Sequence, residues 1–345
     1  MKKGKQNHKI VDVWHTQLND YVTGLGWSND GCWLCASSTK GEVSIINTSD
    51  FSVRLISNAH NDGIICLAHS PSKNRFLTGG QDGKICLWNT EEGRVFKSLE
   101  GGSSWVEHAQ WSPDGEYFAS ASGRILRIWS KDGEMLNEYK EEASTISALY
   151  WKSDSTEIIY ACYGGVKFIR KTENTSYETL PWQNSMISLF WSPDSKFICA
   201  GTQDNCLHVW PLPYKLKSDF QMSGYPNKIK NITWDSESKY MATPSAEDVV
   251  LWKFAGQLPI GTRPQKLSGH HFKISTLQFQ NRGKYLATGD INGEVLLWYP
   301  EEVVDTSISK LNLNSEISAI NWAPNDMRLA IGTRNGLVVL AEISL

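Results

Sequence analysis

Apolar and polar residues alternate along the chain in short runs, and the order of these runs repeats about every 40–45 residues. Each copy starts with a run that ends at an aromatic residue or at His, as in "ISLFW" at 187–191. A polar turn leads to a second run, such as "RFLTGG" at 75–80, and a tight turn leads to a third, such as "ICLW" at 85–88. Such runs, rich in Ile, Val, Phe and Trp and separated by Gly, Asp, Asn and Pro, predict antiparallel strands.

Eight copies can be aligned on the residue that ends the first run: Trp27, His69, Trp111, Trp151, Trp191, Trp234, Phe279 and Trp322. The steps between them are 42, 42, 40, 40, 43, 45 and 43 residues. A fourth, more polar run precedes the next copy, so each copy predicts a four-stranded sheet. Sheets repeated at this period are typical of a β-propeller, in which each blade buries its faces against its neighbours. Eleven of the 15 Trp residues end the first or the third run, which indicates that they pack between blades.

The two ends of the chain complement each other in this pattern. The last copy stops at "LVVLAEISL", 337–345, which is its third run, and the alternating segment "HKIVDVWHT", 8–16, precedes the first copy. Pairing these segments would supply the missing outer strand and avoid an exposed sheet edge. We therefore expect an all-β, eight-bladed propeller as a single domain over residues 8–345, preceded by a basic tail at 1–7. Seven blades are the alternative, because the copy at 157–169 lacks the Trp and the Asp turn.

Composition narrows the classes of function. The net charge of −3 supplies no basic field for nucleic acid or an anionic membrane, and no apolar run is long enough to predict a membrane span or a secretion signal. The seven Cys are odd in number and mostly lie within apolar alternation, which favours free thiols in a reducing compartment such as the cytoplasm. Cys32 and Cys35 have CxxC spacing, but no second ligand pair accompanies them.

The second copy carries a set of four polar and aromatic residues at fixed positions: His60, Thr78, Asp82 and Trp88. On these residues, and on its period, the chain resembles the WD40-repeat proteins over nearly its whole length. The resemblance implies that the four residues form a structural tetrad, hydrogen-bonded across the blade.

The other copies depart from this family pattern. The seventh copy keeps His270, Thr288 and Trp298, but Asn292 stands where Asp is expected. The remaining copies lack the full set, and no third run ends in Trp-Asp.

Residues that would carry catalysis are not evident. There is no GxSxG motif, and "GGQDGK" at 79–84 lacks the spacing of a phosphate loop. We therefore predict no enzyme activity and no catalytic, cofactor-binding or metal-binding residue. The loops that lead into each first strand (the approach loops) and the turns between the second and third strands tolerate change and so are the expected binding surface.

Large side chains off the repeat register mark that surface, because Trp, Tyr and Arg dominate protein-binding hot spots. The predicted partner-binding residues are Trp105, Tyr163, Trp182, Gln203, Tyr225, His271 and Arg334. Trp105 and Trp182 are equally compatible with rings tucked against neighbouring loops. The Gly-Tyr-Pro turn predicts that Tyr225 is exposed.

Three stretches, at 144–169, 222–243 and 247–254, are similar to a narrower bacterial set of stand-alone propellers, often encoded beside CobW-type GTPases. That resemblance implies a metal-homeostasis context and a CobW-type GTPase as partner. Our main hypothesis is a non-enzymatic, monomeric scaffold that docks a protein on its loop-bearing face. The alternatives are a metal-binding protein that uses His271 and a propeller hydrolase that uses Asp20, Asp62 and Glu316.

Overall fold

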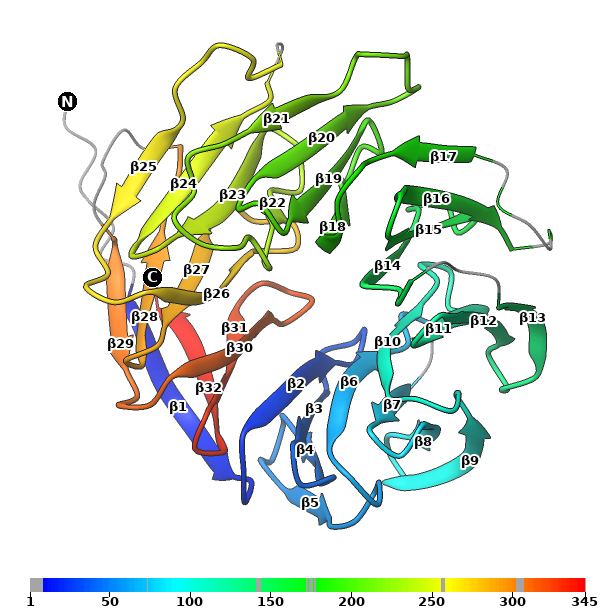
Figure 1. The fold of residues 1–345 in the computed structure, drawn as a ribbon. Coiled ribbons are helices and arrows are strands. Elements are labelled where there is room, and N and C mark those ends of the chain that lie inside the picture. The colour runs from blue at the N-terminus through cyan, green and yellow to red at the C-terminus, as the bar shows by residue number, and fades with distance from the viewer. Residues whose placement is uncertain are drawn as a thin grey trace. The chain divides into compact units, whose positions relative to one another are not determined.

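A computed structural model describes residues 9–72, 74–140, 144–171, 173, 176, 178–255, 258–301 and 307–344. All regular structure in this part of the chain is β (Figure 1), arranged in eight four-stranded sheets. Within the described residues no helix is long and apolar enough to cross a membrane. The structure therefore confirms an all-β propeller with eight blades rather than seven. The predicted basic tail at 1–7 lies outside the described residues.

The sheets divide between two compact units, and five sheets belong to the larger unit, Thr23–Asn231. Blade one is β2 (Val22–Trp27), β3 (Trp33–Ser38), β4 (Val43–Asn47) and β5 (Val53–Ile56). Blade two is β6 (Ile64–His69), β7 (Arg75–Gly80), β8 (Lys84–Asn89) and β9 (Arg94–Glu100). Blade three is β10 (Val106–Trp111), β11 (Tyr117–Ser122), β12 (Ile125–Ser130) and β13 (Met135–Tyr139). Blade four is β14 (Ala148–Trp151), β15 (Glu157–Cys162), β16 (Gly165–Arg170) and β17 (Glu178–Pro181). Blade five is β18 (Met186–Trp191), β19 (Phe197–Thr202), β20 (Leu207–Pro211) and β21 (Phe220–Met222).

The smaller unit joins the described residues up to Val22 with those from Ile232 onward. Blade six is β22 (Thr233–Trp234), β23 (Tyr240–Ser245), β24 (Asp248–Lys253) and β25 (Gln265–Ser268). Blade seven is β26 (Ile274–Phe279), β27 (Leu286–Asp290), β28 (Glu294–Trp298) and β29 (Ser309–Asn312). Blade eight is β30 (Ile317–Trp322), β31 (Arg328–Thr333), β32 (Leu337–Ser344) and β1 (Lys9–Gln17).

The alternating runs place the core between neighbouring blades. In blade two the middle strands β7 and β8 are mostly buried, whereas the outer strand β9 is mostly exposed. Leu77 and Leu87 from these middle strands pack in one cluster with Trp111, Phe118 and Trp129 of blade three. The Trp residues of the repeat therefore fill the space between blades, as their spacing predicts.

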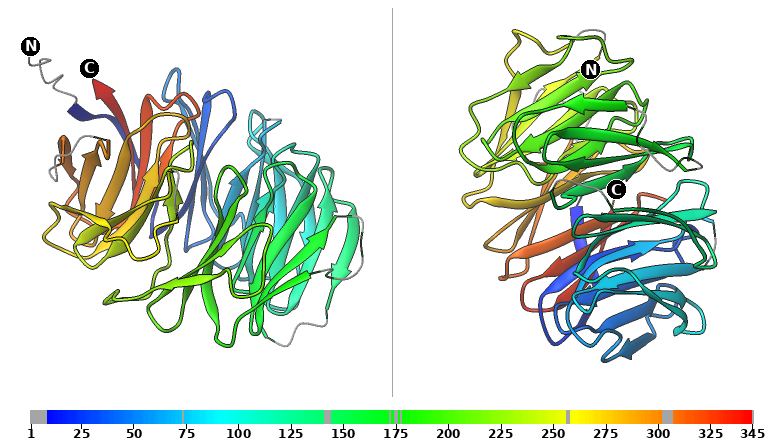
Figure 2. Two further views of the ribbon diagram at one scale, coloured as in Figure 1. Left: turned by 90° about the horizontal axis from the view of Figure 1, so that it is seen from above. Right: turned by 45° about the vertical axis from the view of Figure 1, so that its right-hand side comes forward.

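The N-terminal strand completes blade eight. β1 pairs antiparallel with β32 from Lys9↔Ser344 to Gln17↔Leu337 (Figures 1 and 2). Ile10 is the buried residue of β1, and its backbone N–H donates to Ser309 Oγ at 2.9 Å. The prediction that the chain ends share one sheet is confirmed.

The fourth copy folds regularly although it departs from the repeat. β15 and β16 pair without a shift from Glu157↔Arg170 to Cys162↔Gly165. The tight turn between them uses Gly164 at a φ of +98°, a conformation that glycine adopts without steric cost. Apolar alternation and a glycine turn are sufficient for this blade, and the missing Trp is not required.

Candidate functional site

The tetrad of blade two is a continuous chain of hydrogen bonds. Trp88 Nε1 donates to Thr78 Oγ1 at 2.9 Å, and that hydroxyl lies 2.8 Å from His60 Nε2. His60 Nδ1 lies 2.9 Å from Asp82 Oδ1. A carboxylate only accepts hydrogen bonds, so His60 Nδ1 donates to Asp82. With the ring proton on Nδ1, Nε2 accepts from the threonine hydroxyl, whose oxygen in turn accepts from the indole. Burial raises the pKa of Asp82, but hydrogen bonds led by that from His60 outweigh it, and the pKa lies below its usual value.

Blade seven has the same network, which corrects our expectation that it lacks the acid. Thr288 Oγ1 accepts from Trp298 Nε1 at 2.8 Å and lies 2.7 Å from His270 Nε2. His270 Nδ1 lies 3.0 Å from Asp290 Oδ2. The acid comes from the end of β27, two residues after the threonine, and not from the turn that contains Asn292. Asp290 follows its threonine by two residues and Asp82 follows its threonine by four, yet both carboxylates reach Nδ1 of the tetrad histidine.

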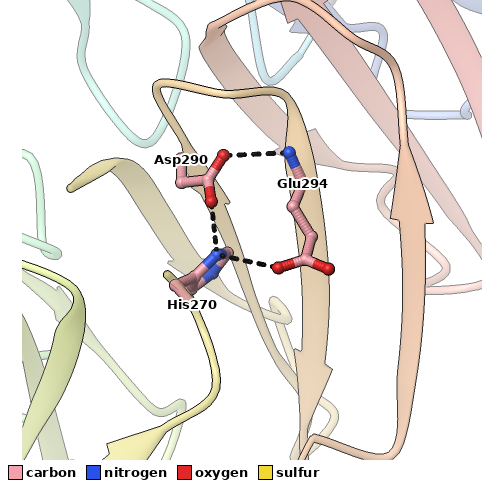
Figure 3. A group of neighbouring side chains, drawn as sticks. All are labelled: His270, Asp290 and Glu294. Atoms are coloured by element: carbon pink, nitrogen blue, oxygen red, sulfur yellow. Dashed lines mark hydrogen bonds and ion pairs between the residues drawn. The ribbon is translucent and has the colours of Figure 1, made fainter. Parts of the chain in front are cut away.

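A second carboxylate lies beside the blade-seven tetrad (Figure 3). Glu294 Oε2 is 3.8 Å from His270 Nδ1, and ligand atoms of His270, Asp290 and Glu294 all lie within 4.8 Å of one another. Burial lowers the pKa of His270 and outweighs the opposite effect of the two acids, so the ring is neutral at pH 7. A neutral imidazole and two carboxylates form a donor set that suits a divalent cation, provided that Nδ1 loses the proton it donates to Asp290, so metal binding would replace that hydrogen bond of the tetrad. His271, the residue named in the alternative metal-binding hypothesis, is exposed and does not belong to this group.

The predicted partner-binding residues fall into different environments. Trp105 and Tyr163 are 52% and 57% exposed, and Gln203 is also exposed. In the smaller unit His271 is exposed, and Arg334 forms an ion pair with Glu316 at 3.1 Å. The remaining two residues, Trp182 and Tyr225, are covered to different degrees.

The prediction that Tyr225 is exposed is wrong, because only 8% of its surface is accessible. Its approach loop lies against blade five. Lys228 Nζ donates to Gln203 Oε1, and Ser188 Oγ donates to the backbone oxygen of Ile229 at 2.8 Å. These hydrogen bonds fix the loop against blade five, and the ring of Tyr225 is buried in spite of the Gly-Tyr-Pro turn.

Trp182 occupies a tetrad position. It precedes Ala200 by 18 residues, the spacing from His60 to Thr78, and Ala200 pairs with His208 as Thr78 pairs with Cys86. Blade five therefore has Trp in place of the tetrad His and Ala in place of the Thr.

The substitution changes the bonding inside blade five. The ring of His208 lies 4.1 Å from that of Trp182 and 4.3 Å from that of Trp210, measured between centroids. Both indole nitrogens and His208 Nδ1 are buried without a hydrogen-bond partner among the described residues. Contacts between aromatic rings thus replace the hydrogen bonds of the tetrad in this blade, and Trp182 packs against the core. The 18-residue spacing was a sequence signal that could have shown this.

Trp105 borders a cavity of about 510 Å³ on the loop side of blades two and three. The lining residues are Gln81, Asp82, Gly83, Ser103, Ser104, Trp105, Glu107, Gly123 and Thr145. Ser144, the neighbour of Thr145, accepts a hydrogen bond at Oγ from the backbone N–H of Tyr163 at 2.7 Å. This bond connects the turn of blade four that contains Tyr163 to the edge of the cavity. Glu107 was missed in the sequence, although a charged residue inside the run "VEHAQW" at 106–111 is a detectable signal.

A second cavity, of about 410 Å³, runs along the first strands β6, β10, β14 and β18 of the larger unit. It shares Glu107 with the loop-side cavity. Tyr150 and Phe190 lie in its wall with ring centroids 5.9 Å apart, and Lys230 adds a positive charge. Glu107 therefore stands where the two hollows meet.

Eight four-stranded blades, two of which carry the hydrogen-bonded His–Thr–Asp–Trp network described above, define a β-propeller of the WD40 type as the class of this protein. The family model described as "WD domain, G-beta repeat" matches residues 49–89, 93–130, 175–211 and 261–299. These four segments are similar to WD40 repeats.

Relatives are distant. Actin-interacting protein 1 of Caenorhabditis elegans is 20% identical over 317 residues, covering 89% of this chain and 51% of that protein. Protein transport protein sec13 of Aspergillus clavatus is 27% identical over 215 residues, covering 55% and 61%. The chain thus spans about half to two thirds of the length of these relatives. The crystal structure of the computationally designed Ika8 protein superposes with a TM-score of 0.79 at 18% identity over 95% of this chain and 98% of that one, which shows the shared fold.

Proposed function

We propose that the protein is a non-enzymatic, cytoplasmic scaffold that docks a protein partner on its loop-bearing face. The observation that carries this proposal is the pair Trp105 and Tyr163, two large aromatic residues that remain more than half exposed on loops of adjacent blades. Exposed aromatic side chains on rigid supports are the usual anchors of protein interfaces, because they bury much area with little loss of conformational entropy.

The comparisons support this class of function. WD40 propellers generally bind protein partners, and the names of two relatives refer to actin interaction and to protein transport. The sequence resemblance to propellers encoded beside CobW-type GTPases makes such a GTPase a candidate partner. In this proposal Trp105, Tyr163 and Gln203 form the contact surface in the larger unit, and Trp182 and Tyr225 support it from below.

The test compares partner capture by two variants. Trp105→Ala combined with Tyr163→Ala removes the two anchors, and Phe96→Ala removes a ring of similar exposure from the outer strand of blade two. We expect the double variant to lose the protein that the wild type captures from native cells, while Phe96→Ala retains it. Equal recovery of that protein by both variants would refute the proposed surface.

Metal binding is a second candidate function, favoured by the group His270, Asp290 and Glu294. Blade two has the same tetrad without the second acid: its third strand begins with Lys84, and the third strand of blade seven begins with Glu294. We expect Glu294→Lys to keep the tetrad and to remove any tightly bound zinc, measured by elemental analysis after preparation with excess Zn²⁺. Metal-free wild-type protein from that preparation would reject this candidate.

A further inference from the structure

The loop-side cavity beside Trp105 has an unbalanced charge. Among the described residues its lining contains two acids, Asp82 and Glu107, and no Lys, Arg or His. Asp82 is already engaged, because its oxygens lie within hydrogen-bond distance of His60 Nδ1 and of the backbone N–H groups of Lys84 and Asn61. Glu107 has no ion pair with any described residue.

The basic residues that follow the lining glycines in sequence do not line the cavity themselves. Lys84 and Arg124 each follow a lining glycine, Gly83 and Gly123, but neither lines the cavity. The cavity therefore presents at least one carboxylate whose partner the described residues do not supply. A half-buried carboxylate without a counter-ion attracts a cation from outside, since its field is less screened than that of an exposed group.

Trp105 adds a second element of recognition at the same cavity. Its indole is 52% exposed and borders the space that Glu107 also lines. An indole face attracts a cation, and Arg does so most often because its planar guanidinium can stack on the ring while its N–H groups reach a carboxylate. Ser103, Ser104 and Thr145 contribute hydroxyl groups that can accept the remaining N–H donors.

We propose that this cavity receives an arginine side chain of the docked partner, presented on an extended segment, with Trp105 stacking on the guanidinium and Glu107 pairing with it. The proposal rests on the scaffold function and specifies what the loop-bearing face recognises. The volume of about 510 Å³ lies within the range of roughly 300–1,000 Å³ typical of ligand sites. A lysine would fit the charge but could not combine stacking with a forked hydrogen bond, and we expect it to bind more weakly.

The test uses three blocked pentapeptides with Gly flanking a central Arg, Lys or citrulline. Citrulline keeps the planar shape of Arg but carries no charge. The full-length protein is labelled with 5-fluorotryptophan, and the resonance of Trp105 is identified by its loss in Trp105→Phe. We expect a saturable shift of this resonance with the Arg peptide, at least tenfold weaker binding of the Lys peptide, and no shift with citrulline at the same concentrations.

Two variants separate charge recognition from general effects on the fold. Glu107→Gln should weaken binding of the Arg peptide at least tenfold with an unchanged unfolding midpoint. Glu134→Gln, an exposed position in the turn before β13 of the same blade, should leave binding unchanged. Equal binding of Arg and citrulline peptides, or full binding by Glu107→Gln, would overturn the proposal. If Glu107→Gln binds the Arg peptide normally while the double variant at Trp105 and Tyr163 loses the partner, the arginine pocket is wrong and the scaffold surface stands.

Discussion

Replacing Thr78 with Val tests how much the tetrad contributes to stability. The substitution keeps the shape of the side chain and removes the hydroxyl that links Trp88 Nε1, at 2.9 Å, to His60 Nε2, at 2.8 Å. Both rings are buried, with Trp88 only 1% and His60 3% exposed. Leaving a buried donor or acceptor unpaired costs about 1–3 kcal/mol. Two such groups therefore predict a loss of about 2–4 kcal/mol, allowing for partial relaxation.

Chemical denaturation in urea measures this loss, and Thr78→Ser is the matched control. Serine keeps the hydroxyl and removes one methyl group, so its cost should be about 1 kcal/mol. The two variants should thus differ clearly in the midpoint of unfolding at the same slope. If Val and Ser at this position destabilise equally, the hydrogen bonds do not carry the stability assigned to them.

Three further perturbations follow from the described contacts. Removal of residues 1–17 should lower the thermal midpoint, because β32 then loses its partner strand; an unchanged midpoint would contradict the closure of blade eight. Gly201→Ala should lower the free energy of unfolding, measured in urea, by at least about 3 kcal/mol, because the added Cβ would lie 1.9 Å from the backbone oxygen of Ile229. A decrease below about 1 kcal/mol would show that the loop containing Ile229 moves to make room. Burial lowers the pKa of His108 to about 4, below the value of about 6.5 in the unfolded chain. The unfolded chain therefore takes up a proton first on acidification. The contribution of His108 to the free energy of unfolding is complete above pH 6.5 and is lost as the pH falls toward 4. His108→Gln should flatten the acid dependence of urea unfolding in that window and the exposed control His15→Gln should not; identical profiles would reject the assignment.

The blade architecture was predictable because it depends on patterns that every copy repeats. Trp111 and Trp129 are buried between blades two and three, as expected from their place at the ends of runs. The pairing of β1 with β32 followed from a missing fourth run at one end of the chain and an unpaired run at the other. Each inference requires only alternation, period and the cost of an open edge.

The candidate site was less predictable, because loops decide it. Tyr225 has a sequence context that favours exposure, yet side-chain and backbone bonds of its neighbours draw the loop onto blade five. The position of Trp182 off the Trp register leaves a surface ring and a tucked ring equally compatible with the sequence, whereas its position on the His register of the tetrad favours the tucked ring. The position of a residue within the repeat is therefore a better guide to its role than its chemical type.

Alternation and a fixed period were enough to predict four-stranded blades, their strand order and most of the core, with eight blades favoured and seven as the alternative, because each small sheet must bury its apolar faces against a neighbour. Only the tertiary structure showed that Asp290 completes the blade-seven tetrad and that Glu294 lies beside it. It also showed that Glu107 shares a cavity with Trp105. These groupings join side chains from separate strands and loops, and their distances depend on the path of turns whose conformation no periodic pattern specifies.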